Sequence, residues 1–403
     1  MSSLNQTPAA GRAHIAFFGL RNAGKSSLVN AFCGQEISIV SDILGTTTDP
    51  VQKAMELLPL GPVMIIDTAG LDDEGALGAQ RVARSKRILN KTDLAVLVTD
   101  AGRPLSALEE ELLALIKQKE IPFIIAKNKA DLLEEMPKNE GQTLYLSAKT
   151  GEGIESLKEL AAKTALADKK ERPLVRDLLK RGDQVILVCP IDEAAPKGRI
   201  ILPQQQTIRD ILDAHAAVMV CQDSELPETL EALKAPPRLI ITDSQVFGKV
   251  SKMVPAEIPL TSFSILMARM KGDLSLAVAG AKAIETIKKG DKILIAEGCT
   301  HHRQCNDIGT VKLPRWIRDY TKTEPEFSFS SGQTFPEDLS AYKMVVHCGG
   351  CTLNDREMQY RLRCCADQGI PVTNYGILIA YLKGILPRTI APFPDLAKIL
   401  ANS

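Results

Sequence analysis

Two short clusters of thiols and imidazoles lie in the last third of the chain. The first is Cys299-Thr300-His301 and the second is His347-Cys348-Gly349-Gly350-Cys351, with 45 residues between them. Four of the nine cysteines and three of the five histidines fall within residues 299–305 or 347–351, which is not expected of cysteines scattered through cores. Thiolate and imidazole bind iron and zinc far better than carboxylate does. The pattern therefore predicts a soft-metal site.

Three thiols are the expected metal ligands: Cys299, Cys348 and Cys351. His301 or His347 is the candidate for a labile fourth ligand, and a site with no fourth protein ligand is the other interpretation. A Cys-x-x-Cys pair alone also fits a redox pair or half of a zinc site, so the prediction depends on the two clusters together.

Each cluster follows a predicted strand. Residues 292–296 and 342–346 are apolar runs, and Cys299 and His347 come directly after them. Loops that leave the carboxyl ends of strands in an open α/β sheet gather at one edge, where ligands bind. The two clusters can therefore meet in space. Glycines beside the thiols leave room for an inorganic cluster and let backbone N–H groups point at sulfur.

The same chain opens with a phosphate-binding pattern. Residues 13–18 form an apolar run of strand length that leads into residues 19–27, which match the P-loop in its strand–loop–helix setting. Its glycines let backbone N–H groups close on phosphate oxygens. Lys25 is expected to reach the β- and γ-phosphates, and the Ser26 hydroxyl to bind magnesium.

Four further segments follow in the order of a GTPase. Residues 45–49 resemble a first switch and residues 63–70 a second, while residues 128–131 resemble the guanine-selecting motif and residues 147–149 the loop that supports the base. The carboxylate of the guanine motif accepts two hydrogens from the guanine edge, for which adenine has no matching donors. Residues 1 to about 168 therefore resemble a complete small GTPase domain.

We predict a specific set of functional residues in this domain. The magnesium ligands are Ser26, Thr47 and Asp67. The catalytic residues are Lys25, Asn22, Thr47 and Gly70. The nucleotide-binding residues are Gly19, Asn22, Ala23, Gly24, Lys25, Ser26, Ser27, Thr46, Thr47, Asp67, Gly70, Asn128, Lys129, Asp131, Ser147, Ala148 and Lys149.

Two positions predict how GTP is hydrolysed. Leu71 stands where Ras-like enzymes carry the glutamine that orients water, so intrinsic turnover should be slow. Asn22 resembles the asparagine of potassium-activated GTPases, whose side-chain oxygen helps to hold K⁺ against the phosphates. The alternative is that asparagine merely tolerates the backbone geometry of the loop.

Composition limits the class of protein. The chain has 403 residues, with 49 basic and 49 acidic side chains, so it has no net field to attract nucleic acid or an anionic membrane. No signal peptide or membrane span is recognisable, and we expect a cytoplasmic protein. Nine cysteines in a reducing compartment should be free thiols or metal ligands.

Three α/β domains are expected. The charged stretch 167–173 ends in proline and is typical of a linker, so the GTP-binding domain should occupy residues 1–170. Strand-like and helix-like runs alternate beyond it, which predicts mostly parallel sheets. We expect a dimerisation or spacer domain at residues 171–263 and a cluster-binding domain at residues 264–403.

The whole chain resembles the maturation GTPases of FeFe-hydrogenases, which combine a GTPase with Cys-x-His and His-Cys-x-x-Cys. The resemblance implies a 4Fe–4S cluster held by Cys299, Cys348 and Cys351, with the fourth iron site open. It implies a homodimeric scaffold that carries a di-iron precursor to apo FeFe-hydrogenase, loaded by two radical S-adenosylmethionine maturases. GTP or GDP, Mg²⁺ and K⁺ are the other implied cofactors.

Two other interpretations remain. The first is a zinc-binding, potassium-dependent GTPase that acts in tRNA modification or ribosome assembly, against which the neutral charge counts. The second is a redox-sensing GTPase whose thiols form disulfides, which would leave the histidines without a role.

Overall fold

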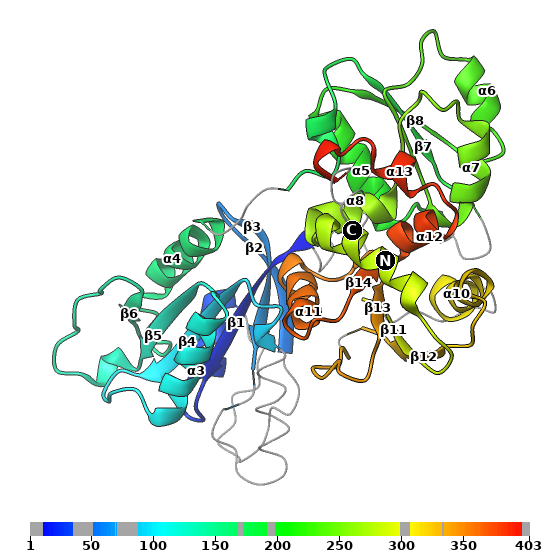
Figure 1. Cartoon of the computed structure of the whole chain (residues 1–403). Helices are drawn as coiled ribbons and strands as arrows, with labels where there is room; N and C mark the ends of the chain where they lie inside the picture. The colour runs from blue at the N-terminus through cyan, green and yellow to red at the C-terminus, as the bar shows by residue number, and fades with distance from the viewer. Residues whose placement is uncertain are drawn as a thin grey trace. The chain divides into compact units, whose positions relative to one another are not determined.

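The computed structural model describes residues 11–34, 51–68, 70, 88–167, 172–191, 198–298, 307–332 and 334–396. The chain divides into two compact units, Met1–Lys170 and Glu171–Ser403 (Figure 1). Both units are α/β, with sheets that are parallel except for one strand pair, so the predicted fold class is confirmed. None of the helices in the described part of the chain has the length and hydropathy needed to span a bilayer.

The N-terminal unit contains one six-stranded sheet in the order β2-β3-β1-β4-β5-β6, in which only β2 and β3 pair antiparallel. Its strands are β1 (Ala13–Gly19), β2 (Val51–Leu57), β3 (Gly61–Asp67), β4 (Leu94–Asp100), β5 (Phe123–Asn128) and β6 (Thr143–Tyr145). Its described helices are α1 (Lys25–Cys33), α3 (Ala107–Gln118) and α4 (Ile154–Ala167), with a 3-10 turn at Ala130–Leu132.

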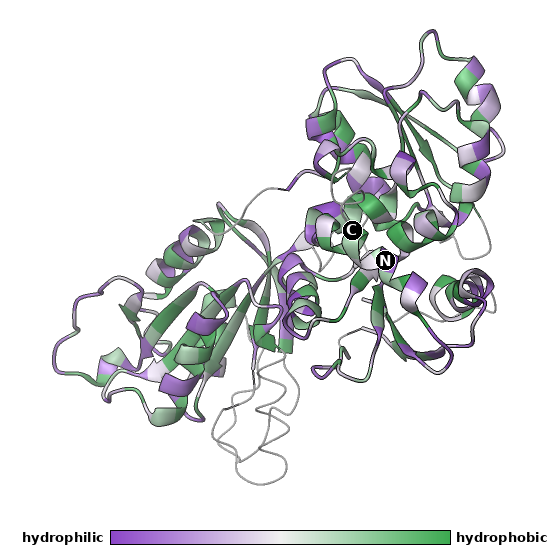
Figure 2. Cartoon of the chain, viewed as in Figure 1, coloured by the Kyte–Doolittle hydropathy of each residue, from purple (hydrophilic) through white to green (hydrophobic). Residues whose placement is uncertain are grey.

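Strand β1 is apolar along its whole length because both faces of this sheet are covered. Ile15 and Phe17 pack in one core with residues of α1 and α4, whereas Ala16 and Phe18 pack in a second core with residues of α3. Successive side chains of a strand point to opposite faces, so one continuous apolar run supplies both cores. The hydropathy colouring shows apolar strands between helices that are part polar and part apolar (Figure 2).

The C-terminal unit contains two four-stranded parallel sheets, β10-β9-β7-β8 and β12-β11-β13-β14. The first comprises β7 (Gln184–Val188), β8 (Ala217–Cys221), β9 (Leu239–Thr242) and β10 (Leu260–Ser262). The second comprises β11 (Lys292–Ala296), β12 (Glu326–Ser330), β13 (Met344–His347) and β14 (Val372–Asn374).

The helices of this unit alternate with its strands. They are α5 (Leu202–Asp213), α6 (Leu226–Glu231), α7 (Phe247–Met253), α8 (Phe263–Lys271), α9 (Leu274–Ala281), α10 (Leu313–Thr321), α11 (Asp355–Asp367), α12 (Tyr375–Leu382) and α13 (Leu386–Ile390). Short 3-10 segments lie at Arg176–Leu178, Ser244–Val246 and Lys282–Thr286, and a π-helical turn lies at Ile308–Lys312.

The two sheets of this unit have the same topology. In each, the first strand in sequence lies between the second and the third, and the fourth lies beyond the third. The turn before each sheet is also the same. Gly182 and Gly290 have φ of 86° and 83°, and the aspartate after each glycine accepts a backbone N–H at 2.8 Å. We refer to residues 182–272 as the first repeat and residues 290–384 as the second repeat.

The sequence repeats most clearly at the end of each repeat. Residues 258–272 and 370–384 share Ile-Pro, Thr, Ile-Leu, Ala and Lys-Gly at matching positions. Ser262 and Asn374 occupy the same place in this pattern, and each caps the helix that follows by accepting a backbone N–H. Helices α8 and α12 are therefore counterparts. They pack against each other, and one buried core includes Leu266 of α8 and Ile377 of α12.

Candidate functional site

The P-loop runs from the end of β1 to the start of α1. Asn22 and Gly24 have φ of 57° and 81°, a left-handed region that glycine adopts freely and asparagine tolerates. A Cβ added at Gly24 would lie 2.3 Å from Nδ2 of Asn128, so this position also needs glycine for space. The backbone alone accounts for an asparagine at position 22, and its role in holding K⁺ stays a prediction.

The residues predicted to bind phosphate and magnesium converge at the end of β3. Lys25 forms an ion pair with Asp67, and the Ser26 hydroxyl donates to Oδ2 of Asp67 at 2.8 Å. Asp67 is fully buried, as is expected of a carboxylate that is paired on both oxygens. Gly70 follows three residues after β3 ends. The predicted magnesium ligands Ser26 and Asp67 therefore lie side by side.

Asn128 joins three of the predicted nucleotide-binding segments. Its Nδ2 donates to the carbonyl oxygen of Ala23 at 3.0 Å, and its Oδ1 accepts the N–H of Ala148 at 2.9 Å. The Ser147 hydroxyl donates to Oδ1 of Asp131 at 2.6 Å and so orients the carboxylate predicted to read guanine. The P-loop, the guanine motif and the base-supporting loop thus form one hydrogen-bonded assembly.

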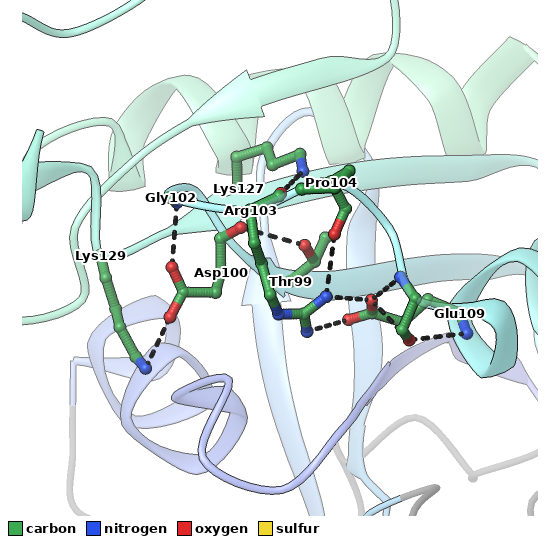
Figure 3. Close-up of polar contacts among 9 residues, drawn as sticks. Thr99, Asp100, Gly102, Arg103, Pro104, Glu109, Lys127 and Lys129 are labelled. Atoms are coloured by element: carbon green, nitrogen blue, oxygen red, sulfur yellow. Dashed lines mark hydrogen bonds and ion pairs between the residues drawn. The ribbon is translucent and has the colours of Figure 1, made fainter.

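Charged contacts that we did not predict hold the guanine motif from the side of β4 (Figure 3). The Lys129 ammonium donates to Oδ2 of Asp100 at 2.9 Å, and Lys127 donates to the carbonyl oxygen of Arg103 at 2.9 Å. The hydrogen bond from Lys129 is the main reason that the pKa of Asp100 is lowered. Asp100 ends β4 at the same sheet edge as the P-loop. Its place in the sequence, directly after an apolar strand, could therefore have identified it as a residue near the nucleotide site.

Several predicted residues lie outside the described part of the chain. In the first domain these are Thr46 and Thr47, together with Leu71. In the last third they are Cys299 and His301. Their predicted roles stay predictions. Ser27 is in the first turn of α1, and Lys149 follows directly after Ala148.

The cysteine clusters belong to the sheet of the second repeat. Strands β11 and β13 are parallel neighbours, and Ala296 pairs with His347 in register. The chain leaves β11 toward β12 on one side and leaves β13 toward β14 on the other. The carboxyl ends of β11 and β13 therefore flank the topological switch point, which is where open α/β sheets bind ligands.

Cys348 is in contact with the segment that precedes Cys299. The N–H of Gly298 donates to Sγ of Cys348 at 3.0 Å, and the N–H of Gly350 donates to the same sulfur at 3.4 Å. The Thr352 hydroxyl donates to the carbonyl oxygen of Gly298 at 2.9 Å. The second cysteine loop therefore contacts Gly298, the last described residue before Cys299.

Burial is the main influence on the pKa of the two described thiols of this site. It raises the pKa of Cys348 to about 11, against the lowering effect of the two N–H donors, and it also raises the pKa of Cys351. Buried sulfur that accepts backbone N–H groups between glycines is the environment that iron–sulfur clusters use. The donor chemistry fits such a cluster. Over the described residues alone, no group of three or more His, Cys, Asp or Glu side chains forms a metal site.

His347 has both ring nitrogens in contact with protein. Its Nδ1 lies 2.8 Å from the carbonyl oxygen of Cys348, and its Nε2 lies 3.1 Å from Nη1 of Arg361. A guanidinium can only donate, so Nε2 accepts and the proton is on Nδ1. Burial, with a contribution from Arg361, lowers the pKa of His347 to about 3, so the ring is neutral.

Arg361 was not among the predicted residues. It lies on α11 and pairs with Glu357, four residues earlier, while its guanidinium also donates to the carbonyl oxygen of Gly332 at 2.6 Å. The i,i+4 spacing of the two charges in the sequence could have indicated that they pair. Such a pair is, however, typical of a solvated helix face. The sequence did not reveal that this pair is buried.

The fold and the first site define the chain as a P-loop GTPase followed by two further α/β parts. Residues 14–129 match a family model described as a 50S ribosome-binding GTPase. Residues 174–272 match the hydrogen maturase F dimerization domain, and residues 275–392 match the hydrogen maturase F tetramerization domain. These last two models together span more than half of the chain, which belongs to the hydrogen maturase F family.

Relatives outside this family resemble the GTPase part. The tRNA modification GTPase MnmE of Nitrosomonas europaea is 36% identical over 156 residues, which are 38% of this chain and 34% of the relative. The MnmE of Legionella pneumophila (strain Corby) is 39% identical over 149 residues, or 36% and 33% of the two chains. The chain thus spans about a third of the length of these curated relatives.

Two solved structures are similar to part of the chain. A probable GTP-binding protein engB covers 38% of this chain and all of its own, with 22% identity and a TM-score of 0.32. Era in complex with a 16S ribosomal RNA segment covers 55% of this chain and 98% of its own, with 19% identity and a TM-score of 0.36.

Proposed function

We propose that this protein is a GTP-hydrolysing scaffold that binds a 4Fe–4S cluster and delivers a di-iron precursor to apo FeFe-hydrogenase. The observation that supports it most directly is the 3.0 Å hydrogen bond from Gly298 to Sγ of Cys348, since it brings the residue beside Cys299 to the second cysteine cluster. Membership of the hydrogen maturase F family supports the same proposal.

In the GTPase domain, Lys25 binds the β- and γ-phosphates while Ser26, Thr47 and Asp67 hold magnesium. Asp131, oriented by Ser147, selects guanine. Gly70 directs its N–H to the γ-phosphate, and Asn22 holds K⁺, which raises the rate of hydrolysis. A change of nucleotide alters the loops that carry Thr47 and Gly70, and a switch of this kind needs different contacts in its two states.

In the second repeat, Cys299, Cys348 and Cys351 hold the cluster, which supplies an iron with an open coordination position. His347 supports the loop instead of binding iron, because its two nitrogens already contact Cys348 and Arg361. His301 remains the histidine candidate for a fourth ligand. The backbone N–H groups of Gly298 and Gly350 stabilise thiolate at Cys348.

The oligomeric scaffold is a homodimer that works in the cytoplasm with two radical S-adenosylmethionine maturases and apo FeFe-hydrogenase, without nucleic acid. The domains predicted from the sequence are residues 1–170, 171–263 and 264–403. The matched dimerization and tetramerization domains support self-association. In the repeat pattern, α8 belongs with the residues that precede it. We therefore place the end of the second domain at Gly272 instead of residue 263.

Strand β8 is the surface through which two copies pair. It is an edge strand of its sheet, and Met219 and Val220 on it are 38% and 48% exposed. An edge strand with exposed apolar side chains presents unpaired backbone groups to a second strand. The strand lies within the part that matches the dimerization domain, which favours a second copy of this chain as the occupant.

Anaerobic purification tests the proposal. Brown protein that contains iron and sulfide and gives an EPR signal on reduction is expected. Replacing Cys299, Cys348 and Cys351 together by alanine should abolish iron binding and hydrogenase activation while leaving GTP hydrolysis unchanged. Intact iron content in the triple variant would exclude the proposed ligands.

A zinc-binding, potassium-dependent GTPase in tRNA modification or ribosome assembly is the second candidate. The likeness of the first domain to the tRNA modification GTPase MnmE favours it. Colourless protein with bound zinc and no sulfide is its expected result in the same purification.

A further inference from the structure

Lys271 is a buried lysine at the end of α8, in the first repeat. Its side chain contacts the cysteine loop of the second repeat, and the residue is only 2% exposed. Its Nζ lies 3.3 Å from the carbonyl oxygen of Gly350, 3.1 Å from that of Cys351 and 2.6 Å from that of Leu353. Burial of a lysine is unfavourable unless its donors and its charge are compensated.

The number of acceptors fits the charged form. An ammonium has three N–H donors and no acceptor, and three carbonyl oxygens surround Nζ. A neutral amine has only two N–H groups and could not donate to all three oxygens, although the Gly350 oxygen also accepts the N–H of Leu353 at 3.1 Å. Within the described parts of the chain, no carboxylate lies at ion-pair distance from Nζ. Burial lowers the pKa of Lys271, and the fields of Asp355, Cys351 and Cys348 oppose that shift without cancelling it. The case for a bound ammonium therefore depends on the three carbonyl contacts.

The contact between the repeats is reciprocal. Gln359 of α11, in the second repeat, donates from Nε2 to the carbonyl oxygens of Lys271 and Gly272 at 2.9 and 3.0 Å. The last turn of α8 thus donates to the cysteine loop through its side chain and accepts from α11 through its backbone. Neither repeat contains this arrangement by itself.

The repeat supplies a matched comparison. Lys383 occupies the same position in the second repeat, at the end of α12, and is followed by glycine as Lys271 is. It is exposed, and its Nζ lies 5.5 Å from the ring of Trp316. A lysine at this place in the fold therefore does not have to be buried. The burial of Lys271 is tied to the loop that it contacts.

We propose that Lys271 is a positioning residue of the cluster site, whose ammonium fixes the loop from Cys348 to Leu353 and balances the negative charge of the thiolate-bound cluster. The inference rests on the proposed function, because it takes the cluster as the bound group. It makes the first repeat, which matches the dimerization domain, a contributor to the site. Positive charge beside an iron–sulfur cluster favours its reduced, more negative form.

The test compares Lys271→Gln with Lys383→Gln after anaerobic reconstitution of the full chain with ferrous iron and sulfide. Loss of a supporting contact is expected to weaken iron retention against EDTA by roughly 10–100-fold for Lys271→Gln. Its midpoint potential, followed by EPR, should fall because the cation is gone. Lys383→Gln should match the wild type in both measurements. Lys271→Arg should keep the wild-type potential, since it keeps the charge.

The outcomes separate the inference from the proposed function. If the wild type takes up no iron and sulfide, the proposed function fails. If the wild type loads but Lys271→Gln equals it in iron retention and potential, the inference alone is overturned. Should Lys271→Gln fail to fold, the inference is tested on the wild type by measuring how fast reductive methylation labels Lys271 and Lys383. Iron loading should then slow the labelling of Lys271 without changing that of Lys383, and equal labelling rates with and without iron would overturn the inference.

Discussion

Replacing Arg361 by methionine should strongly destabilise the C-terminal unit. Arg361 is 1% exposed. It donates from Nε to Oε1 of Glu357 at 3.0 Å, to the carbonyl oxygen of Gly332 and to Nε2 of His347, and its guanidinium lies 5.2 Å from the ring centroid of Phe335. Methionine preserves most of the volume but none of the donors.

The magnitude follows from what the substitution leaves behind. The Glu357 side chain is nearly buried and would lose its only ion pair among the described residues. Removing one partner of a buried pair typically costs about 3–5 kcal/mol, since the remaining charge is uncompensated. We therefore expect the free energy of unfolding of this unit to fall by about 3–5 kcal/mol in Arg361→Met.

Urea unfolding followed by tryptophan fluorescence is the assay. Trp316 is the single tryptophan of the chain and lies in the C-terminal unit, so its emission reports that unit without interference from the GTPase domain. Arg318→Met is the matched control. Arg318 also pairs with a glutamate, at 2.9 Å, and also stacks on a phenylalanine ring, at 5.0 Å, but its side chain is 42% exposed. A loss of about 0.2–1 kcal/mol is expected there.

A double variant separates the charge effect from packing. Adding Glu357→Gln to Arg361→Met removes the uncompensated carboxylate and should recover part of the lost stability. A loss below about 1 kcal/mol for Arg361→Met, similar to that of an exposed pair, would refute the reasoning. Failure of the double variant to recover any stability would refute the charge argument and leave packing as the cause.

Three further predictions concern other parts of the chain. Asn22→Gly keeps the left-handed backbone and removes the amide, so it should retain GDP binding but hydrolyse GTP equally fast in potassium and sodium salts, whereas the wild type should be faster in potassium. Burial raises the pKa of Cys189 and Cys365 to about 12, so both thiols stay protonated at neutral pH and iodoacetamide should modify them only as the pH approaches that value. Fast native alkylation at pH 8 would contradict this. The double variant Met219→Asp, Val220→Asp should sediment as a monomer, and an unchanged oligomer would exclude pairing through β8.

The sequence was sufficient to predict the elements that carry strong local patterns. The apolar run 13–18 predicts β1, which extends from Ala13 to Gly19, and the P-loop follows in the predicted place. The run 292–296 coincides with β11. The contact between Gly298 and the second cysteine loop was predictable because parallel strands place their carboxyl ends at one edge.

The charged residues around the cysteine loop could not be predicted in the same way. Lys271 and Arg361 contact carbonyl oxygens and an imidazole that are distant in sequence; Gly350, for example, is 79 positions after Lys271. On a helix, either residue is expected on a solvated face. The internal repeat, by contrast, could have been found in the sequence. Residues 258–272 and 370–384 both contain Ile-Pro-x-Thr followed by Ile-Leu and Lys-Gly, a similarity that a search for internal repeats detects.

The packing of α8 against α12 has a practical consequence for anyone who dissects this protein. A fragment that starts after Gly272 would retain both segments that bear the thiols, yet it would expose the apolar side of α12 around Ile377 and strip three carbonyl groups of their shared donor. Truncation at that boundary should therefore give an aggregation-prone product, and poor metal uptake by it would say little about the intact chain.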